Sequence, residues 1–160
     1  MVATPFRGPL TQGVNFDLYQ QTQIFELGTT ADGSNGKKYR YVKFLDAVTY
    51  AAGHVCTHGT TTLINQHTVT NDRAGGSSLG AAVAGVLEGG VNVPVQNDFG
   101  WIQIAGECAP LGTYSADDTL IAHSSVDGTA VVDAYSAAKA SYAPFAYAKT
   151  SAIAILRGLV

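Results

Sequence analysis

Residues 24–45, IFELGTTADGSNGKKYRYVKFL, decide the fold of this chain. Two β-prone runs, residues 24–31 and 37–45, flank the turn sequence DGSNG. Asp-Gly and Asn-Gly pairs supply the positive φ angles that tight hairpin turns require. In the second run large side chains occupy both alternating sets of positions, so at least one face is expected to be packed. The stretch therefore predicts a β-hairpin.

Further strand signals follow the hairpin. Gly53 is expected to turn the chain into a strand over HVCTH, residues 54–58, and the β-branched run TTTLINQHTV, residues 60–69, predicts another. The segment AAVAGVLEGG, residues 81–90, spaces its larger side chains as a helix would. Its glycines nevertheless favour a strand.

The last third of the chain continues the pattern. WIQIAGECAPL, residues 101–111, predicts a strand, and residues 119–135 predict a second hairpin with Asp-Gly at its tip. SAAKASYA, residues 136–143, is expected to form a short helical turn that Pro144 ends. Residues 150–160 predict a closing strand. So many short strands indicate an all-β fold, either a small barrel or a sandwich.

Residues 1–24 differ from the rest because prolines, glycines and glutamines interrupt their apolar residues. Aromatic side chains such as Phe6, Phe16 and Tyr19 keep neither a helical nor a strand period. We therefore expect an extended N-terminal arm over residues 1–24 and a single β-rich domain over residues 25–160. Fully extended, such an arm reaches roughly 80 Å. A disordered or self-packed N-terminus is the alternative.

The chain carries few charges. Only 13% of its 160 residues are charged, with a net charge of −3, whereas soluble domains average about 25%. Lys and Arg do not cluster as phosphate binding requires, so we expect no nucleic-acid partner. Low charge fits a surface buried in an assembly and equally a β-protein with a hydroxyl-rich coat. Both explanations stay open.

Neither end of the sequence predicts a membrane segment. Residues 1–13 place Pro and Gly where a signal peptide needs an apolar run, and residues 152–160 are too few to span a bilayer. Cys56 and Cys108 could form one disulfide. Without a secretory signal, two buried thiols are the expectation.

Asp98 begins the triplet Asp-Phe-Gly in NDFGWIQIAG, residues 97–106, which protein kinases use to hold magnesium. A kinase also needs a Gly-rich loop, a strand lysine and a His-Arg-Asp loop. The sequence contains none of these. Asp98 is therefore predicted to be the corner of a tight turn that leads into a β-strand.

Two further patterns resemble catalytic motifs without their context. Tyr135 and Lys139 match the Tyr-x-x-x-Lys of short-chain dehydrogenases, but the glycine fingerprint and the βαβ rhythm of a dinucleotide fold are missing. Ser136 with Lys139 gives Ser-x-x-Lys without its companion motifs. Asp117 and Asp118 are adjacent, so they make a poor acid–base pair. We expect no catalytic residues and no cofactor.

His54, Cys56 and His58 alternate onto one face of their predicted strand. Neighbours on that face could share a zinc ion, with His67 or Cys108 completing the site. The sequence has no second dense pair of ligands. A strand face with polar rims and one buried thiol is therefore the expectation, and no metal site is assigned.

Several stretches in order resemble the head-decoration, or cement, proteins of tailed bacteriophages. They are FELGTTADGSNGKKYRYVKF, AAGHVCT, a small-residue strand and NDFGWIQIAG, which together cover residues 25–106. Phe99 stands where Tyr is more common before the glycine. The resemblance implies a small β-barrel or β-tulip on the outside of a capsid, usually as a homotrimer with an extended arm across neighbouring subunits, and without catalytic residues.

The function implied is mechanical: the protein would bridge major capsid subunits and so stabilise the shell by linkage. The expected partners are the major capsid protein and further copies of the chain, with neither nucleic acid nor membrane. The expected location is the virion exterior, after assembly in the host cytoplasm. Since aromatic residues dominate interface energetics, the residues expected to contact the capsid or neighbouring subunits are Phe6, Phe16, Tyr19, Phe25 and Trp101.

Three rival functions remain open. A carbohydrate-binding module of a phage fibre would need an exposed aromatic platform, for which the sequence offers a single tryptophan. An enzyme would have to use the tyrosine–lysine pair or a zinc site. A tail or connector component shares the β-rich composition.

Overall fold

The computed structural model describes residues 14–33, 36–45, 49–59, 67–72, 82–90, 92–122, 126–132 and 144–157. Within these ranges the chain is all-β, without a helix. Its ten strands are β1 Thr30–Asp32, β2 Lys38–Phe44, β3 Val55–His58, β4 Thr68–Thr70, β5 Val83–Val86, β6 Phe99–Cys108, β7 Thr119–Ala122, β8 Ala130–Val132, β9 Ala146–Ala148 and β10 Ala154–Leu156.

Five strands close into a barrel in the order β2-β4-β3-β5-β6, and β6 pairs back onto β2. The closing pair is antiparallel over six residue pairs, from Lys38 opposite Ala105 to Lys43 opposite Phe99. Closure removes the open sheet edges that would otherwise attract other chains. β2 pairs with β4 in parallel, which a local hairpin cannot produce. β1 extends the sheet beside the N-terminal half of β2.

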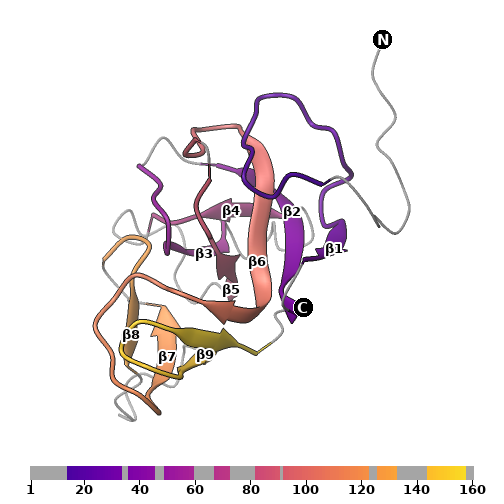
Figure 1. Cartoon of the computed structure of the whole chain (residues 1–160). Helices are drawn as coiled ribbons and strands as arrows, with labels where there is room; N and C mark the ends of the chain where they lie inside the picture. The colour runs from indigo at the N-terminus through magenta and orange to yellow at the C-terminus, as the bar shows by residue number, and fades with distance from the viewer. Residues whose placement is uncertain are drawn as a thin grey trace.

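The remaining strands form a second sheet beside the barrel (Figure 1). β6 is long enough to join the two parts, because its last residues leave the barrel and pair with β10. From β10 the order continues through β9 and β7 to β8, all antiparallel. Gly106 in β6 has a φ of 93°, and a Cβ there would come within 3.0 Å of the Gly36 carbonyl oxygen. The change of sheet therefore occurs at a position that requires glycine.

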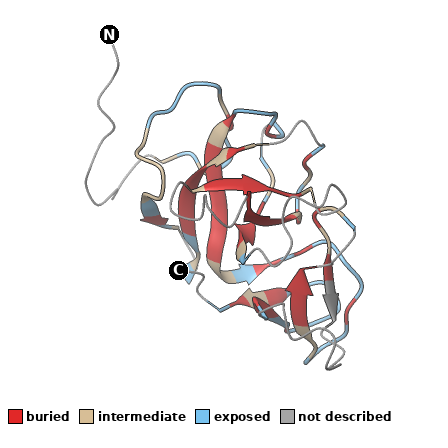
Figure 2. Cartoon of the chain, turned by 180° about the vertical axis from the view of Figure 1, so that it is seen from behind, coloured by how far each residue is buried: buried red, intermediate tan, exposed pale blue. Residues whose placement is uncertain are grey.

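Burial runs through both parts of the molecule (Figure 2). The barrel interior is filled by large side chains together with two small ones: Tyr19, Val42, Phe44, Tyr50, Cys56, Val69, Ala84, Leu87, Ile102 and Ile104. An aromatic cluster containing Tyr39, Tyr41 and Trp101 covers the opposite face of β2 and β6. A cluster of twelve buried residues lies between the second sheet and barrel strands β3 and β5, and five of its members are alanines: Ala122, Ala130, Ala146, Ala148 and Ala154.

Both predicted hairpins are confirmed. β1 pairs with β2, although β1 begins later than the predicted residue 24 because residues 24–29 make turns and single hydrogen bonds. β7 pairs with β8, and Gly128 supplies a φ of 62° near the tip. The preference for a strand over residues 81–90 is also correct, since β5 lies there.

The sequence did not predict β9, and the short helical turn expected over residues 136–143 lies outside the described residues. β9 follows Pro144, and two of its three residues are alanines, which have low strand propensity. Neighbouring strands hold it in place instead: it pairs with β10 on one side and β7 on the other.

Candidate functional site

Three of the five residues expected to contact other subunits gather in one cluster of their own chain. Phe16 stacks on Tyr39 with ring centroids 4.1 Å apart and meets Trp101 edge-on at 5.4 Å. Phe25 lies 5.3 Å from Trp101. Trp101 itself is only 2% exposed, so it cannot serve as a stacking platform for a sugar ring. The cluster attaches both ends of the segment 16–25 to the barrel wall.

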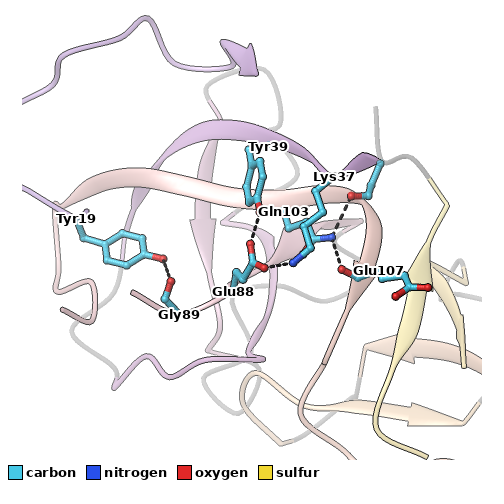
Figure 3. Close-up of polar contacts among 8 residues, drawn as sticks. Tyr19, Lys37, Tyr39, Glu88, Gly89, Gln103 and Glu107 are labelled. Carbon is cyan, nitrogen blue, oxygen red and sulfur yellow. Dashed lines mark hydrogen bonds and ion pairs between the residues drawn. The ribbon is translucent and has the colours of Figure 1, made fainter. Parts of the chain in front are cut away.

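Tyr19 lies apart from this cluster, in the barrel core. It is 3% exposed, its ring centroid lies 5.6 Å from that of Phe44, and its hydroxyl donates to the Gly89 carbonyl at 3.5 Å (Figure 3). Its backbone N–H donates to Asn92 at 3.2 Å, and the Asn92 amide donates back to its carbonyl at 2.9 Å. A Cβ on Gly100 would come 2.3 Å from the ring. Burial raises the pKa of Tyr19 above its ordinary value.

The segment 14–25 therefore lies on the barrel of its own chain. Besides the contacts of Tyr19, Gln20 and Phe99 exchange two backbone hydrogen bonds of 3.1 and 2.8 Å. Residues 14–25 are therefore self-packed, which is the alternative to a free arm. Residues 1–13, with Phe6, lie outside the described residues.

An exposed apolar surface results from this packing. Two segments that hydrogen bond to each other, residues 17–24 and 92–98, carry four large apolar side chains that point to solvent. We call them the rim patch: Leu18 is 41% exposed, Ile24 48%, Val93 52% and Val95 56%. Within residues 17–24 and 92–98, Asp17 is the one exposed charged side chain. These four residues were not predicted from the sequence, although Val93 and Val95 alternate with Pro94 in a pattern typical of a sheet edge.

The prediction that Asp98 forms the corner of a turn is confirmed. Its carboxylate accepts the Val95 N–H at 2.9 Å, and its own N–H donates to the Val95 carbonyl at 3.0 Å. Asn97, between them, has a φ of 68°. The second carboxylate oxygen accepts a hydrogen bond from the Gln21 side chain. With both oxygens engaged and 4% exposure, Asp98 connects the segment 14–25 to the start of β6.

A second turn of the same design precedes β7. Asp118 accepts the Ser115 N–H at 2.6 Å and donates its own N–H to the Ser115 carbonyl at 3.3 Å. Asp117 takes the positive φ, 70°. Asp117 and Asp118 therefore belong to a turn, and Asp118 is less buried than Asp98.

The thiols and histidines near β3 do not gather into a metal-binding group among the described residues. In the described part of the chain, no three His, Cys, Asp or Glu side chains are placed to share a metal ion. Cys56 and Cys108 are free and buried, as expected, and burial raises the pKa of each to about 12. His54 instead shares a hydrogen bond of 2.7 Å with the Asn71 amide.

The tyrosine–lysine pair cannot be placed, because Tyr135, Ser136 and Lys139 lie outside the described residues.

Within the described part, no helix is long and apolar enough to cross a bilayer.

A cleft of about 550 Å³ opens between β5 and the C-terminal half of β6. Lys37 and Glu88 form an ion pair on one wall, and the Tyr39 hydroxyl donates to the other oxygen of Glu88 (Figure 3). Gln103, which is fully buried, borders the same cleft. The sequence carries no local signal for this group, because 51 residues separate Lys37 from Glu88.

Comparison of the chain with protein-family models, with curated proteins and with solved structures finds no match. The geometry of the chain and the physical chemistry of its residues therefore carry the functional argument.

Proposed function

We propose that this protein is a structural component of a virion that binds the outside of a phage capsid and stabilises the shell by bridging major capsid subunits. The ordered motifs over residues 25–106 support the proposal, since they resemble those of cement proteins. The observation that carries it is the rim patch, an exposed apolar surface on a chain that has few charges.

The composition of the rim patch suits a protein interface. Interface cores are depleted in charged residues, and the segments that form the patch expose one carboxylate among neutral side chains. Each large aliphatic side chain contributes about 1.5–3 kcal/mol when a partner buries it fully. Four such side chains on rigid, hydrogen-bonded segments can supply the centre of a standard interface.

In this proposal the aromatic residues support the contact surface. Tyr19 and Trp101 are covered almost completely by their own chain, so they fix the position of the segment that carries Leu18 and Ile24. Phe16 and Phe25 are partly buried in the cluster around Trp101 and support the same segment. The proposed partners remain the major capsid protein and further copies of this chain, arranged as a homotrimer on the virion exterior.

The test is co-sedimentation of the purified protein with expanded capsids of its phage. The double variant Leu18→Ser, Val95→Ser should bind at least about tenfold more weakly, because two buried aliphatic contacts are lost. Leu111→Ser is the matched control. Leu111 is 48% exposed, between the values of Leu18 and Val95, but it lies outside the patch. Full occupancy by the double variant, or an equal loss by the control, would contradict the assignment of the patch.

A deletion distinguishes shell binding by the N-terminal residues from shell binding by the rim patch. Removing residues 1–22 would also remove the buried contacts of Tyr19, so a shorter deletion of residues 1–13 is the cleaner experiment. If this part of the chain grips neighbouring subunits, the shortened protein keeps its unfolding midpoint and loses occupancy on the shell. Unchanged occupancy would leave the rim patch as the binding surface and reject a contribution from residues 1–13.

A further inference from the structure

His54 lies where the barrel meets the β7–β8 hairpin of the second sheet. On the barrel side, its carbonyl accepts the Leu87 N–H at 2.9 Å. On the hairpin side, its imidazole ring packs against Gly128 so closely that a Cβ on this glycine would come 2.5 Å from the ring. Two backbone hydrogen bonds join the same parts: the Val55 N–H donates to the Gly128 carbonyl at 2.7 Å, and the Gly128 N–H donates to the Asn71 carbonyl at 3.0 Å. His54 therefore belongs to the contact that holds the hairpin on the barrel.

The Asn71 side chain decides which nitrogen of His54 carries the proton. It is fully buried, and its Nδ2 donates to the Thr49 carbonyl at 3.1 Å. A carbonyl only accepts, so this contact fixes the orientation of the amide. The same Nδ2 lies 2.7 Å from Nδ1 of His54. Because Nδ2 is a donor, Nδ1 must be the acceptor, and the neutral ring carries its proton on Nε2.

A protonated His54 does not fit this arrangement. The imidazolium has an N–H on both nitrogens, so Nδ1 and the Asn71 amide would face each other as two donors. Turning the amide does not remove the conflict, because its oxygen would then face the Thr49 carbonyl oxygen. The ring cannot tilt toward the hairpin either, because Gly128 lies against it. The closed contact therefore requires the neutral ring.

The surroundings of His54 let the ring change its charge at mildly acidic pH. The residue is partly exposed, so water reaches it. Burial lowers its pKa below the ordinary value of about 6.5, and the negative charge of Asp127 on the hairpin opposes this shift. Other elements packed against His54 carry Asp72, next to the amide contact, and Glu88, which is in an ion pair. The Cys56 thiol donates to the His54 carbonyl and stays neutral, because burial raises its pKa to about 12.

We propose that His54 is a pH-sensitive switch whose protonation releases the β7–β8 hairpin from the barrel. Above about pH 6.5 the neutral ring keeps the contact closed. Below this pH the open form binds a proton more readily than the closed form, because the open ring is hydrated and no longer faces the Asn71 donor. The contact then opens locally while the barrel stays folded. The proposal is independent of capsid binding.

Hydrogen exchange of the full-length chain between pH 7.5 and 5.5 tests the proposal. The reporters are the amides of Gly128 and Val55, which donate the two backbone bonds across the contact. Their protection factors should fall as the pH falls below 6.5, by at most about tenfold per pH unit, because one proton is bound. The Phe99 amide, which donates to Gln20 on the barrel wall, should change less. Protection factors of Gly128 and Val55 that stay constant, or that only parallel those of Phe99, would overturn the proposal.

Matched variants identify the group that titrates. His54→Gln does not titrate, and its side-chain oxygen can still accept from Asn71, so the pH dependence at Gly128 should disappear. His58→Gln removes a different histidine and should leave that dependence unchanged. The assignment is wrong if the dependence survives His54→Gln or is abolished by His58→Gln.

Two further measurements do not depend on the folding of His54→Gln. In the parent chain, NMR signals of the His54 ring should titrate with the same midpoint as the Gly128 amide. Asp127→Asn keeps an Asn-Gly turn but removes the charge that favours the imidazolium, so it should move this midpoint to lower pH. Different midpoints for the ring and the amide, or a midpoint that Asp127→Asn leaves unchanged, would each contradict the switch.

Discussion

The barrel and the second sheet reach a buried core by opposite means. Large aromatic and aliphatic side chains fill the barrel, with Phe44 and Tyr50 meeting edge-on at 5.0 Å. In the second sheet, alanines supply much of the core, and Gly112 lies so near Ala130 that a Cβ on Gly112 would come 2.3 Å from the Ala130 carbonyl oxygen. The barrel should therefore be sensitive to the removal of volume, and the second sheet to its addition.

Removing volume from the barrel should have the largest effect. Phe44 is 0% exposed and touches Tyr19 as well as Tyr50. Phe44→Ala should lower the free energy of unfolding by about 3–5 kcal/mol, because it creates a cavity that rigid neighbours cannot fill. Urea unfolding measures the loss. Tyr147→Ala in the second sheet, at an exposed position, should cost far less, and equal losses would remove the distinction between the parts.

Adding volume to the second sheet should come next. Ala148 is fully buried in β9 between β7 and β10. Ala148→Leu should destabilise the protein by about 1–3 kcal/mol through overpacking. Ala116→Leu, at an exposed turn, is the control and should be nearly neutral. The comparison fails if Ala148→Leu is as stable as the parent protein in urea, because the sheet would then have unused space.

The paired turns allow the sharpest comparison between the two parts. Asp98→Ala removes the buried carboxylate that accepts from the Val95 N–H and the Gln21 amide, so it should cost about 1–3 kcal/mol. Asp118→Ala removes a single bond to Ser115 in a more exposed turn and should cost about 0.5–1.5 kcal/mol. Unfolding of both variants in urea gives the ranking. A reversed order would show that the buried Asp98 contacts contribute less than their geometry implies.

Protonation of a histidine at acidic pH should have the smallest effect on the free energy of unfolding. Burial lowers the pKa of His58 and His67, and the charge of Arg40 nearby lowers both further. The unfolded chain therefore binds protons first, near the ordinary value of about 6.5. The contribution of the neutral histidines to the free energy of unfolding is complete above that pH. It decreases as the pH falls below it, by at most about 1.4 kcal/mol per pH unit for each histidine.

Urea unfolding between pH 7.5 and 5.5 checks this dependence. His58→Gln should show a shallower slope than the parent protein, because glutamine does not titrate. If the two slopes are the same, His58 is not among the groups that couple folding to protons.

Local chemistry made part of this fold predictable. The hairpins at Asp32–Gly36 and Asp127–Gly128 carry their turn signals within a few residues, and the turn at Asp98 does too. β9 could not be predicted, because its position depends on two neighbouring strands rather than on its own residues. The parallel pairing of β2 with β4 and the closure of β2 onto β6 also depend on contacts between distant residues.

The candidate site was predictable only in outline. Their aromatic side chains identified Phe16, Tyr19 and Phe25 as expected contact residues, but they could not show that these residues pack on their own barrel. That outcome depends on small residues elsewhere, because Gly90 and Gly100 make room for Tyr19 and its neighbours. Once the anchors are buried, the exposed residues between and beside them become the available surface.

The central claim is that the rim patch binds this barrel to a capsid, and cryo-electron microscopy of the phage particle tests it most directly. A reconstruction should show this barrel protein on the outer shell with Leu18 and Val95 against the major capsid protein. The claim would be contradicted if the protein lay in the tail, were missing from the particle, or docked with Leu18 and Val95 facing solvent.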